Sequence, residues 1–266
     1  MPIVPSIKTI PLSQDAFGKL AFEVMRHVFE IHDEYGRFFD EIIYKRELTR
    51  RMAGLELEVA VDVIHKTFQK TYYADVIANG GGLFEFKAAE AIHPRHRAQI
   101  THYLLLFGFH HGKIINMRPE AVEHEFVNVR SNLLELRNPR YRDNSGLTRS
   151  DNARDLRSIC VGLIQDWGTG LDLSLYEEAI THFLGGEAEV LFPISVAGTD
   201  GELGTQKMRL ARPDAAFKLT GFSPNSPALA RFQVHAQRLL NHTSLESIEW
   251  INMHQTEVTF TTIQRA

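Results

Sequence analysis

The chain of 266 residues contains little cysteine and no long hydrophobic run. Its one cysteine, Cys160, excludes an internal disulfide framework and a cysteine-based zinc site. None of its apolar stretches approaches the roughly 20 residues that cross a bilayer as a helix. The first residues, MPIVPSIKTIPLSQD, lack the basic start and apolar core of a secretory signal. We therefore expect a cytoplasmic protein without a membrane-embedded part.

The sequence also lacks a large excess of charge of either sign, because its formal net charge is −4. The balance nevertheless changes along the chain. Residues 1–130 carry 16 Lys and Arg against 17 Asp and Glu, residues 131–157 carry 6 against 4, and residues 158–266 carry 7 against 12. A polyanion would therefore be held by the first half and the arginine-rich segment after it. The alternative, which charge alone favours, is that these arginines belong to a solvated linker.

Segment 72–87, YYADVIANGGGLFEFK, combines charged residues with a turn. Its asparagine and three glycines predict a hairpin, so that Asp75 lies on a strand antiparallel to the one carrying Glu85 and Lys87. Because side chains alternate along a strand, Glu85 and Lys87 point to the same face. An acid from one strand thus meets an acid and an amine from the next.

Asp75, Glu85 and Lys87 are the residue types that metal-assisted phosphodiester hydrolysis requires. Carboxylates from adjacent strands, with the carbonyl of Phe86, would bind Mg²⁺ or Mn²⁺ through hard oxygen ligands. Glu41 would add a ligand from a preceding helix, and Lys87 would orient the attacking water and offset charge on the phosphate. The alternative is a surface ion pair on an edge hairpin, which contributes little. Spacing alone leaves both interpretations open.

A weak internal repeat runs through the sequence. Segment 31–48, IHDEYGRFFDEIIYKREL, aligns with segment 164–180, IQDWGTGLDLSLYEEAI, which brings Gly36 onto Gly168 and Tyr44 onto Tyr176. Segment 86–99 aligns with segment 217–233, and IINM at 114–117 aligns with WINM at 250–253. The matches keep the same order in both halves, which indicates a tandem duplication.

The predicted elements follow the same order in both halves. In the first half we expect helices at 15–34 and 39–53, a strand over LELEVAVDVIH, a hairpin at 67–77 and 82–88, a helix at 94–107, and strands at 111–117 and 122–129. In the second half we expect helices at 152–166 and 172–184, strands at 187–196, 206–211 and 214–219, a helix at 226–240, and strands at 247–252 and 256–262. The expected organisation is an α/β domain at 1–130, a linker at 131–150 and a second α/β domain at 151–266.

Several motifs of the first half occur in an order that resembles a known family. They are EIHDEYG with His32 and Gly36, FFDEIIY with Glu41 and Tyr44, the strand with Asp75, FEFK with Glu85 and Lys87, and HPRHRAQITHYL with Gln99 and Tyr103. Residues 15–130 thus resemble the PD-(D/E)XK nuclease superfamily and, more narrowly, its bacterial GxxExxY proteins. Two positions depart from the pattern, because Phe38 replaces the first motif glycine and Ala74 replaces the usual proline before the aspartate.

The resemblance implies a restriction-endonuclease-like α-β-β-β-α-β core with a mixed central sheet flanked by helices, and a Mg²⁺- or Mn²⁺-dependent nuclease. DNA is the favoured substrate, and the sequence leaves the choice between DNA and RNA open. The resemblance also implies a catalytic centre of Glu41, Asp75, Glu85 and Lys87, assisted by Gln99 and Tyr103. These last two lie one helical turn apart and share a face. The alternative for Gln99 and Tyr103 is a polar cap on an apolar helix, and the alternative for the protein is a non-catalytic scaffold that binds nucleic acid or protein.

The second copy lacks the predicted site. In the alignment Leu173 replaces Glu41, Ala216 replaces Glu85 and the position of Asp75 falls near Leu210, although Lys218 and Gln233 remain. Without carboxylates these residues cannot bind Mg²⁺. We therefore expect a degenerate domain that packs on its twin as an internal pseudo-dimer or binds a protein partner. The chain would then be a monomer, or it would form a homodimer.

Overall fold

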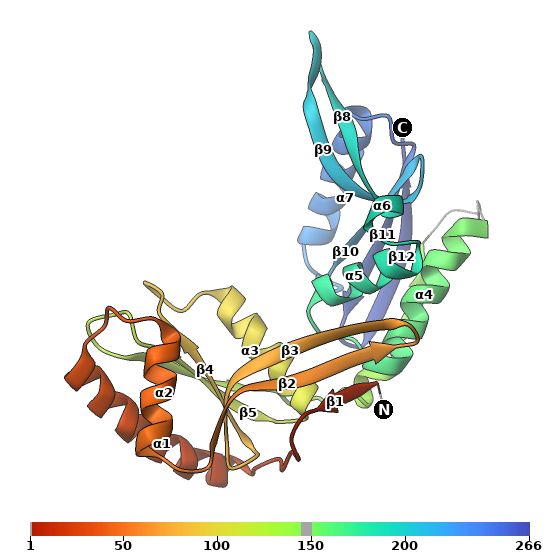
Figure 1. Ribbon diagram of the computed structural model, residues 1–266. Helices are drawn as coiled ribbons and strands as arrows, with labels where there is room; N and C mark the ends of the chain where they lie inside the picture. The colour runs from red at the N-terminus through yellow and green to blue at the C-terminus, as the bar shows by residue number, and fades with distance from the viewer. Residues whose placement is uncertain (1, 145–150) are drawn as a thin grey trace. The chain divides into compact units, whose positions relative to one another are not determined.

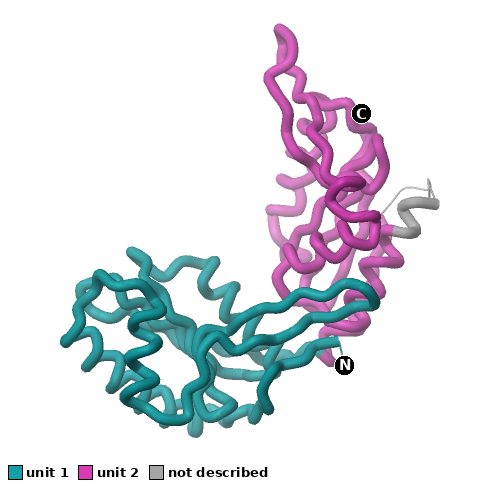
Figure 2. Tube along the Cα trace, viewed as in Figure 1, with its two compact units in different colours: residues 1–133 teal, residues 134–266 magenta. Residues whose placement is uncertain are grey.

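The protein is described from a computed structural model, which covers residues 2–144 and 151–266. The chain divides into two compact units, residues 1–133 and residues 134–266 (Figure 2). Each unit contains one mixed sheet flanked by helices (Figure 1), so the predicted α/β class is confirmed. Within the described residues, no helix combines the length and the hydrophobicity that a membrane-spanning helix requires.

Two helices open the first unit. Helix α1 (Gln14–Tyr35) begins at Ser13, whose side chain accepts a hydrogen bond from the amide of Ala16, and its apolar residues recur with helical spacing and are buried. It ends at Gly36, whose φ of 71° is left-handed and favours glycine. Helix α2 (Glu41–Arg51) follows after a short turn. The boundaries of both helices lie within two residues of those predicted.

The sheet of the first unit has the order β1-β2-β3-β4-β5-β6. Its strands are β1 (Ile3–Pro5), β2 (Leu55–His65), β3 (Phe68–Ala78), β4 (Gly82–Lys87), β5 (His111–Asn116) and β6 (Glu123–Asn128). β4 and β5 are parallel, and all other neighbours are antiparallel. The crossover between β4 and β5 is helix α3 (Pro94–Phe107). Strand β1 was not predicted, because its three residues carry no periodic signal.

The two faces of β4 have different partners. Phe84 and Phe86 belong to the apolar core that α1 and α2 form with β3, β4 and β5. The intervening Glu85, like Lys87, points to the opposite face, because side chains alternate along a strand. Helix α3 packs on that opposite face, where Gly112 allows a close approach. A Cβ atom at Gly112 would lie 3.0 Å from Ile100 and 3.1 Å from Leu104 of the helix. The alternation therefore directs Glu85 and Lys87 towards α3.

The second unit has the sheet order β7-β12-β11-β10-β9-β8. Its elements are a short 3₁₀ helix η1 (Glu135–Arg137), β7 (Arg140–Asp143), α4 (Asp151–Trp167), α5 (Leu173–Phe183), α6 (Glu187–Val190), β8 (Leu191–Gly198), β9 (Gly201–Arg212), β10 (Ala215–Thr220), α7 (Ala228–Asn241), β11 (Ser247–His254) and β12 (Glu257–Gln264). The strand predicted at 187–196 begins as the helical turn α6. Strand β7 and helix η1 lie in the segment expected as a linker, and residues 145–150 of that segment lie outside the described residues.

Strands β2 to β6 and strands β8 to β12 share one order and one set of directions. In each unit the third and fourth of these strands are parallel and joined by a helix, and the others are antiparallel. The additional strand lies at opposite edges, since β1 pairs with β2 and β7 pairs with β12. The two units therefore have the same core topology.

Two local contacts are also the same in both units. The hydroxyl of Tyr44 donates to the carbonyl of Gly36 at 2.9 Å, and that of Tyr176 donates to the carbonyl of Gly168 at 2.5 Å. The Asn116 amide bonds to both main-chain groups of Ala89. The Asn252 amide does the same with Phe222. The tyrosines, the glycines and the asparagines of these contacts match in the sequence alignment, so equivalent positions make equivalent contacts.

The pairing of the parallel strands corrects one part of that alignment. Lys87 pairs with Asn116, whereas Thr220 pairs with Asn252, so Thr220 is the counterpart of Lys87. Lys218 is then the counterpart of Glu85, and the alignment was wrong to give Ala216 that place. The error arose because both strands contain the dipeptide Phe-Lys. Relative to the neighbouring parallel strand, however, the dipeptide of β10 lies two residues earlier than that of β4. If the antiparallel pairing of Ala216 with Leu210 is continued along both strands, Lys218 comes opposite Met208. Met208, not Leu210, is therefore the counterpart of Asp75.

Candidate active site

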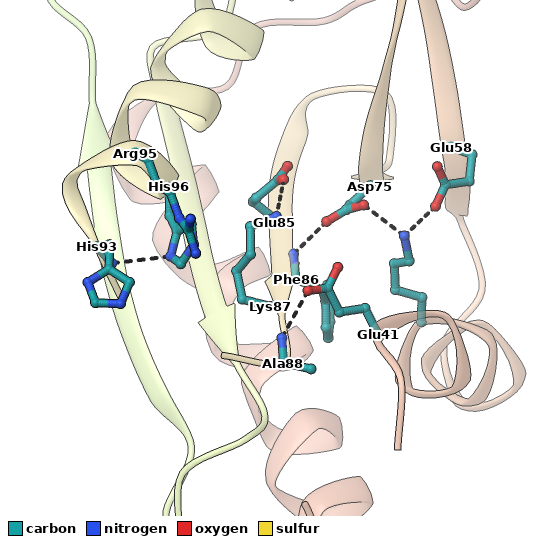
Figure 3. A network of polar contacts seen from close by, with 11 residues as sticks. Glu41, Glu58, Asp75, Glu85, Phe86, Lys87, Ala88, His93, Arg95 and His96 are labelled. Atoms are coloured by element: carbon teal, nitrogen blue, oxygen red, sulfur yellow. Dashed lines mark hydrogen bonds and ion pairs between the residues drawn. The ribbon is translucent and has the colours of Figure 1, made fainter. Parts of the chain in front are cut away.

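The predicted site residues come together where β3, β4 and the start of α2 meet (Figure 3). Asp75 accepts a hydrogen bond from the main-chain amide of Phe86 at 2.8 Å. Glu41, the first residue of α2, accepts one from the amide of Ala88 at 2.9 Å. Both carboxylates are thereby fixed against the same end of β4. The predicted convergence of Glu41 and Asp75 on this strand is present in the structure.

Glu85 is the most deeply buried acid of the group, with 1% of its surface exposed. Its Oε1 accepts a hydrogen bond from Lys87 at 2.7 Å. Its Oε2 is buried and has no hydrogen-bond partner. An unpaired buried carboxylate oxygen is costly, because it has lost water without gaining a donor. The second oxygen of Glu85 is therefore left without a hydrogen-bond donor in a buried position.

The neighbouring charges and burial shift the pKa values of Glu85 and Lys87. Burial, with the negative charges of Asp75 and Glu41 added to it, raises the pKa of Glu85 to about 8, although Lys87 opposes this rise. Burial alone would lower the pKa of Lys87, but the charge of Glu85 and their hydrogen bond raise it. Without a further cation, these shifts favour the protonated form of Glu85 and the charged form of Lys87. A cation at the open Oε2 would remove the reason for that protonation.

Two residues of the site were missed by the sequence analysis. Lys45 of α2 is buried and donates to Asp75 Oδ1 at 2.7 Å and to Glu58 Oε1. Lys45 follows Glu41 by four residues, so helical spacing alone brings it to the same side of α2. Glu58 gives no such signal, because its position depends on strand pairing. It lies opposite Asp75, between the pairs Leu57–Val76 and Val59–Ala74.

Gln99 and Tyr103 lie on α3, the helix that covers this face of β4. Tyr103 is 7% exposed and is hydrogen-bonded to Gln99. Burial raises the pKa of Tyr103, and the negative charges of Glu85 and Asp75 add to the rise. Tyr103 therefore lies within the electrostatic range of the carboxylates, and Gln99 reaches the site only as its hydrogen-bond partner. The raised pKa favours the protonated hydroxyl.

The histidines of the first unit have structural partners. His32 bonds to the carbonyl of Pro119, as expected for a buried helix histidine. His93 and His96 form a capping box at the start of α3. His110 and His111 bond to Val129 and Asn128, respectively. None of these contacts brings a histidine ring to the carboxylates.

The donor set fits a hard divalent cation such as Mg²⁺. The open Oε2 of Glu85 and the carboxylates of Asp75 and Glu41 supply anionic oxygens, and Mg²⁺ is commonly held by one or two carboxylates with several waters. Over residues 2–144 and 151–266, no group of three or more His, Cys, Asp or Glu side chains is arranged to hold a metal ion. Asp75, Glu85 and Glu41 are therefore not already arranged as a closed metal cage.

The predicted superfamily is confirmed for most of the first unit. Residues 18–129 match the sequence model of the PD-(D/E)XK nuclease superfamily. Proteins of this superfamily are in general nucleases and typically use divalent metals such as Mg²⁺. Neither the curated proteins nor the solved structures gave a significant match to the chain. Residues 18–129 therefore form a PD-(D/E)XK nuclease superfamily domain with a restriction-endonuclease-like fold.

Proposed function

We propose that the protein is a Mg²⁺- or Mn²⁺-dependent nuclease that hydrolyses phosphodiester bonds in DNA. The observation that carries this proposal is the buried, unpaired Oε2 of Glu85 beside Asp75 and Lys87. Membership of residues 18–129 in a nuclease superfamily supports the same reaction class.

Each residue of the proposed centre has a separate task. Glu85 and Asp75, with Glu41 and the carbonyl of Phe86 as further ligands, would hold the cation. A bound divalent ion polarises the phosphoryl oxygen and acidifies a bound water. The Nζ of Lys87 would orient the attacking water and offset the charge that develops on the phosphate. Tyr103, supported by Gln99, would donate a hydrogen bond to a water or phosphate oxygen.

A cleavage assay with a matched control tests this proposal. Labelled single- and double-stranded DNA is incubated with Mn²⁺ and with the wild type, Glu85→Ala, Lys87→Ala or Lys218→Ala. Lys218 is the control because it lies on β10, the strand of the second unit that corresponds to β4. We expect Glu85→Ala and Lys87→Ala to abolish cleavage and Lys218→Ala to retain it. Identical products from all four proteins would show contamination and refute the proposal.

Two other functions give different outcomes in the same experiment. A scaffold that retains the nuclease fold would bind DNA or a protein and cleave nothing. A hydrolase of small phosphoesters would turn over a chromogenic phosphodiester through Glu85 and ignore DNA. Labelled RNA in parallel reactions separates the two nucleic acids.

We further propose that the second unit is a degenerate copy of the first. Support comes from the shared strand order and from two pairs of equivalent contacts. These are the tyrosine–glycine hydrogen bonds and the hydrogen bonds of Asn116 and Asn252 to main-chain groups. At the positions of Glu41, Asp75 and Glu85, the second unit has Leu173, Met208 and Lys218, so none of these three positions carries an acid that could bind a cation. Its proposed role is to stabilise its twin as an internal pseudo-dimer or to bind a protein partner. Narrower membership in the GxxExxY proteins, a bacterial origin and a cytoplasmic location stay predictions.

A further inference from the structure

Lys45 already occupies the place beside Asp75 where a metal ion would add positive charge. Its Nζ lies 2.7 Å from Asp75 Oδ1 and also bonds Glu58. The lysine side chain is 5% exposed and that of Asp75 is 13% exposed, so the contact is largely shielded from water. A charge pair of this kind interacts more strongly than one at the surface.

Glu58, which accepts a hydrogen bond from Lys45, has an unusual backbone conformation. Its φ is 49°, in the left-handed region that a residue with a side chain rarely adopts within a strand. The pairs on either side of Glu58 keep the normal register, so no inserted residue accounts for this angle. Such strain persists only when the surrounding structure enforces it, and it concentrates at functional sites. Here it accompanies the bond between Glu58 and Lys45.

The two acids that share Lys45 differ in their contact with water. The side chain of Glu58 is 47% exposed, whereas that of Asp75 is 13% exposed. A lysine that leaves Asp75 for Glu58 therefore moves towards solvent and keeps a counter-ion. A divalent cation at Asp75 would repel Lys45, and Glu58 offers the position to which the amine retreats.

We propose that Lys45 is a resident counter-cation that balances Asp75 in the metal-free protein and yields to the metal by moving onto Glu58. Lys45 and Glu58 are then positioning residues that set metal affinity, without touching the substrate. The proposal rests on the proposed function, because it assumes that Asp75 binds a divalent ion.

Direct measurement of Mn²⁺ binding tests the proposal without an activity readout. The paramagnetic resonance signal of free Mn²⁺ gives the dissociation constant for the wild type, Lys45→Met, Lys45→Arg and Glu58→Gln. We expect Lys45→Met to bind Mn²⁺ at least about tenfold more tightly, because it removes a positive charge near the ion. Lys45→Arg restores the charge and should return the affinity towards that of the wild type. Glu58→Gln should weaken binding severalfold, since Lys45 then has Asp75 as its remaining acid.

The double variant separates an indirect role of Glu58 from a direct one. If Glu58 acts through Lys45, Glu58→Gln should have little effect in the Lys45→Met background. Arg51→Met is the matched control, because Arg51 lies on the same helix but pairs with Glu34 and Glu47. It should leave Mn²⁺ affinity unchanged. Thermal melting without metal checks that each variant is folded, and the Mn²⁺-induced rise in melting temperature should be largest for Lys45→Met.

Each contrary outcome has a distinct meaning. An unchanged or weakened Mn²⁺ affinity in Lys45→Met would show that Lys45 is a fixed structural tie, and this inference alone would fall. An equal effect of Glu58→Gln in both backgrounds would show that Glu58 acts on the ion itself, which also overturns the inference. If no folded variant, the wild type included, binds Mn²⁺, both the inference and the proposed function are wrong.

Discussion

The buried acid Glu85 should make the metal-free protein less stable as the pH rises. Its pKa is about 8 in the folded chain against an ordinary 4.5, so the folded state binds more protons between these values than the unfolded state does. The stabilisation from this extra proton binding is complete below about pH 4.5 and is lost as the pH rises through about 8. The difference between these two pKa values, at 1.36 kcal/mol per pH unit, corresponds to up to about 5 kcal/mol of unfolding free energy.

The comparison of wild type with Glu85→Gln isolates this effect. Glutamine resembles the protonated acid, so the variant should lack the loss of stability and become more stable than wild type at high pH. Urea unfolding in EDTA is measured at intervals from about pH 5 to 9, and the difference in unfolding free energy is plotted against pH. Other titrating groups largely cancel in this difference. Added Mn²⁺ should reduce the difference by stabilising the ionised form of Glu85 in the wild type.

Glu125→Gln serves as the matched control. Its hydrogen bond with Arg97 lowers the pKa of Glu125, so the stability it contributes is complete above about pH 4.5 and is lost only at lower pH. The difference between wild type and Glu125→Gln should therefore be constant across the measured range. If the Glu85→Gln difference is equally constant, Glu85 is ionised throughout, and the argument from its burial and unpaired oxygen is wrong.

Three further substitutions test buried contacts inside the units, two in the first unit and one in the second. Lys113 is 2% exposed, and burial lowers its pKa. Lys113→Met should therefore raise the unfolding free energy by about 1–2 kcal/mol in urea denaturation at pH 7. A loss of stability would show that the charge is needed. Tyr176→Phe leaves the buried carbonyl of Gly168 without its donor and should cost about 1–2 kcal/mol in the same assay, whereas no loss would make that hydrogen bond dispensable. Gly81→Ala would bring a Cβ atom within 2.1 Å of the Ile10 carbonyl and should cost about 1–3 kcal/mol, seen as a lower melting temperature. An unchanged melting temperature would show that the segment around Ile10 moves aside freely.

Helix and strand boundaries of the first unit were largely predictable from local patterns. The apolar spacing of α1, the alternation of β2 and the turn between β3 and β4 each depend on residues close in sequence. The misses have two causes. Strands β1 and β7 are short and are held by pairing with distant strands. The residues of α6 and β8 were read as one strand because the sequence of α6, EAEV, alternates charged and apolar residues as a half-buried strand does.

The candidate site was predictable to the extent that its residues belong to ordered motifs. Glu41, Asp75, Glu85 and Lys87 were identified from their types and order, and the structure places them around the end of β4. Glu58 was not predictable, because its role depends on a left-handed backbone and on a partner from another element. The register error between β4 and β10 has the same origin, since pairing with β11 decides which lysine stands where.

The sequence by itself determined the class of both units, the order of their elements and the residue types of the centre, because these depend on local periodicity and on motifs a few residues long. Only the tertiary structure decided which oxygen of Glu85 is left open, which cation balances Asp75 and which residues of β10 match those of β4. These outcomes depend on burial and on pairing between strands that are distant in sequence, and neither quantity is encoded in any one segment.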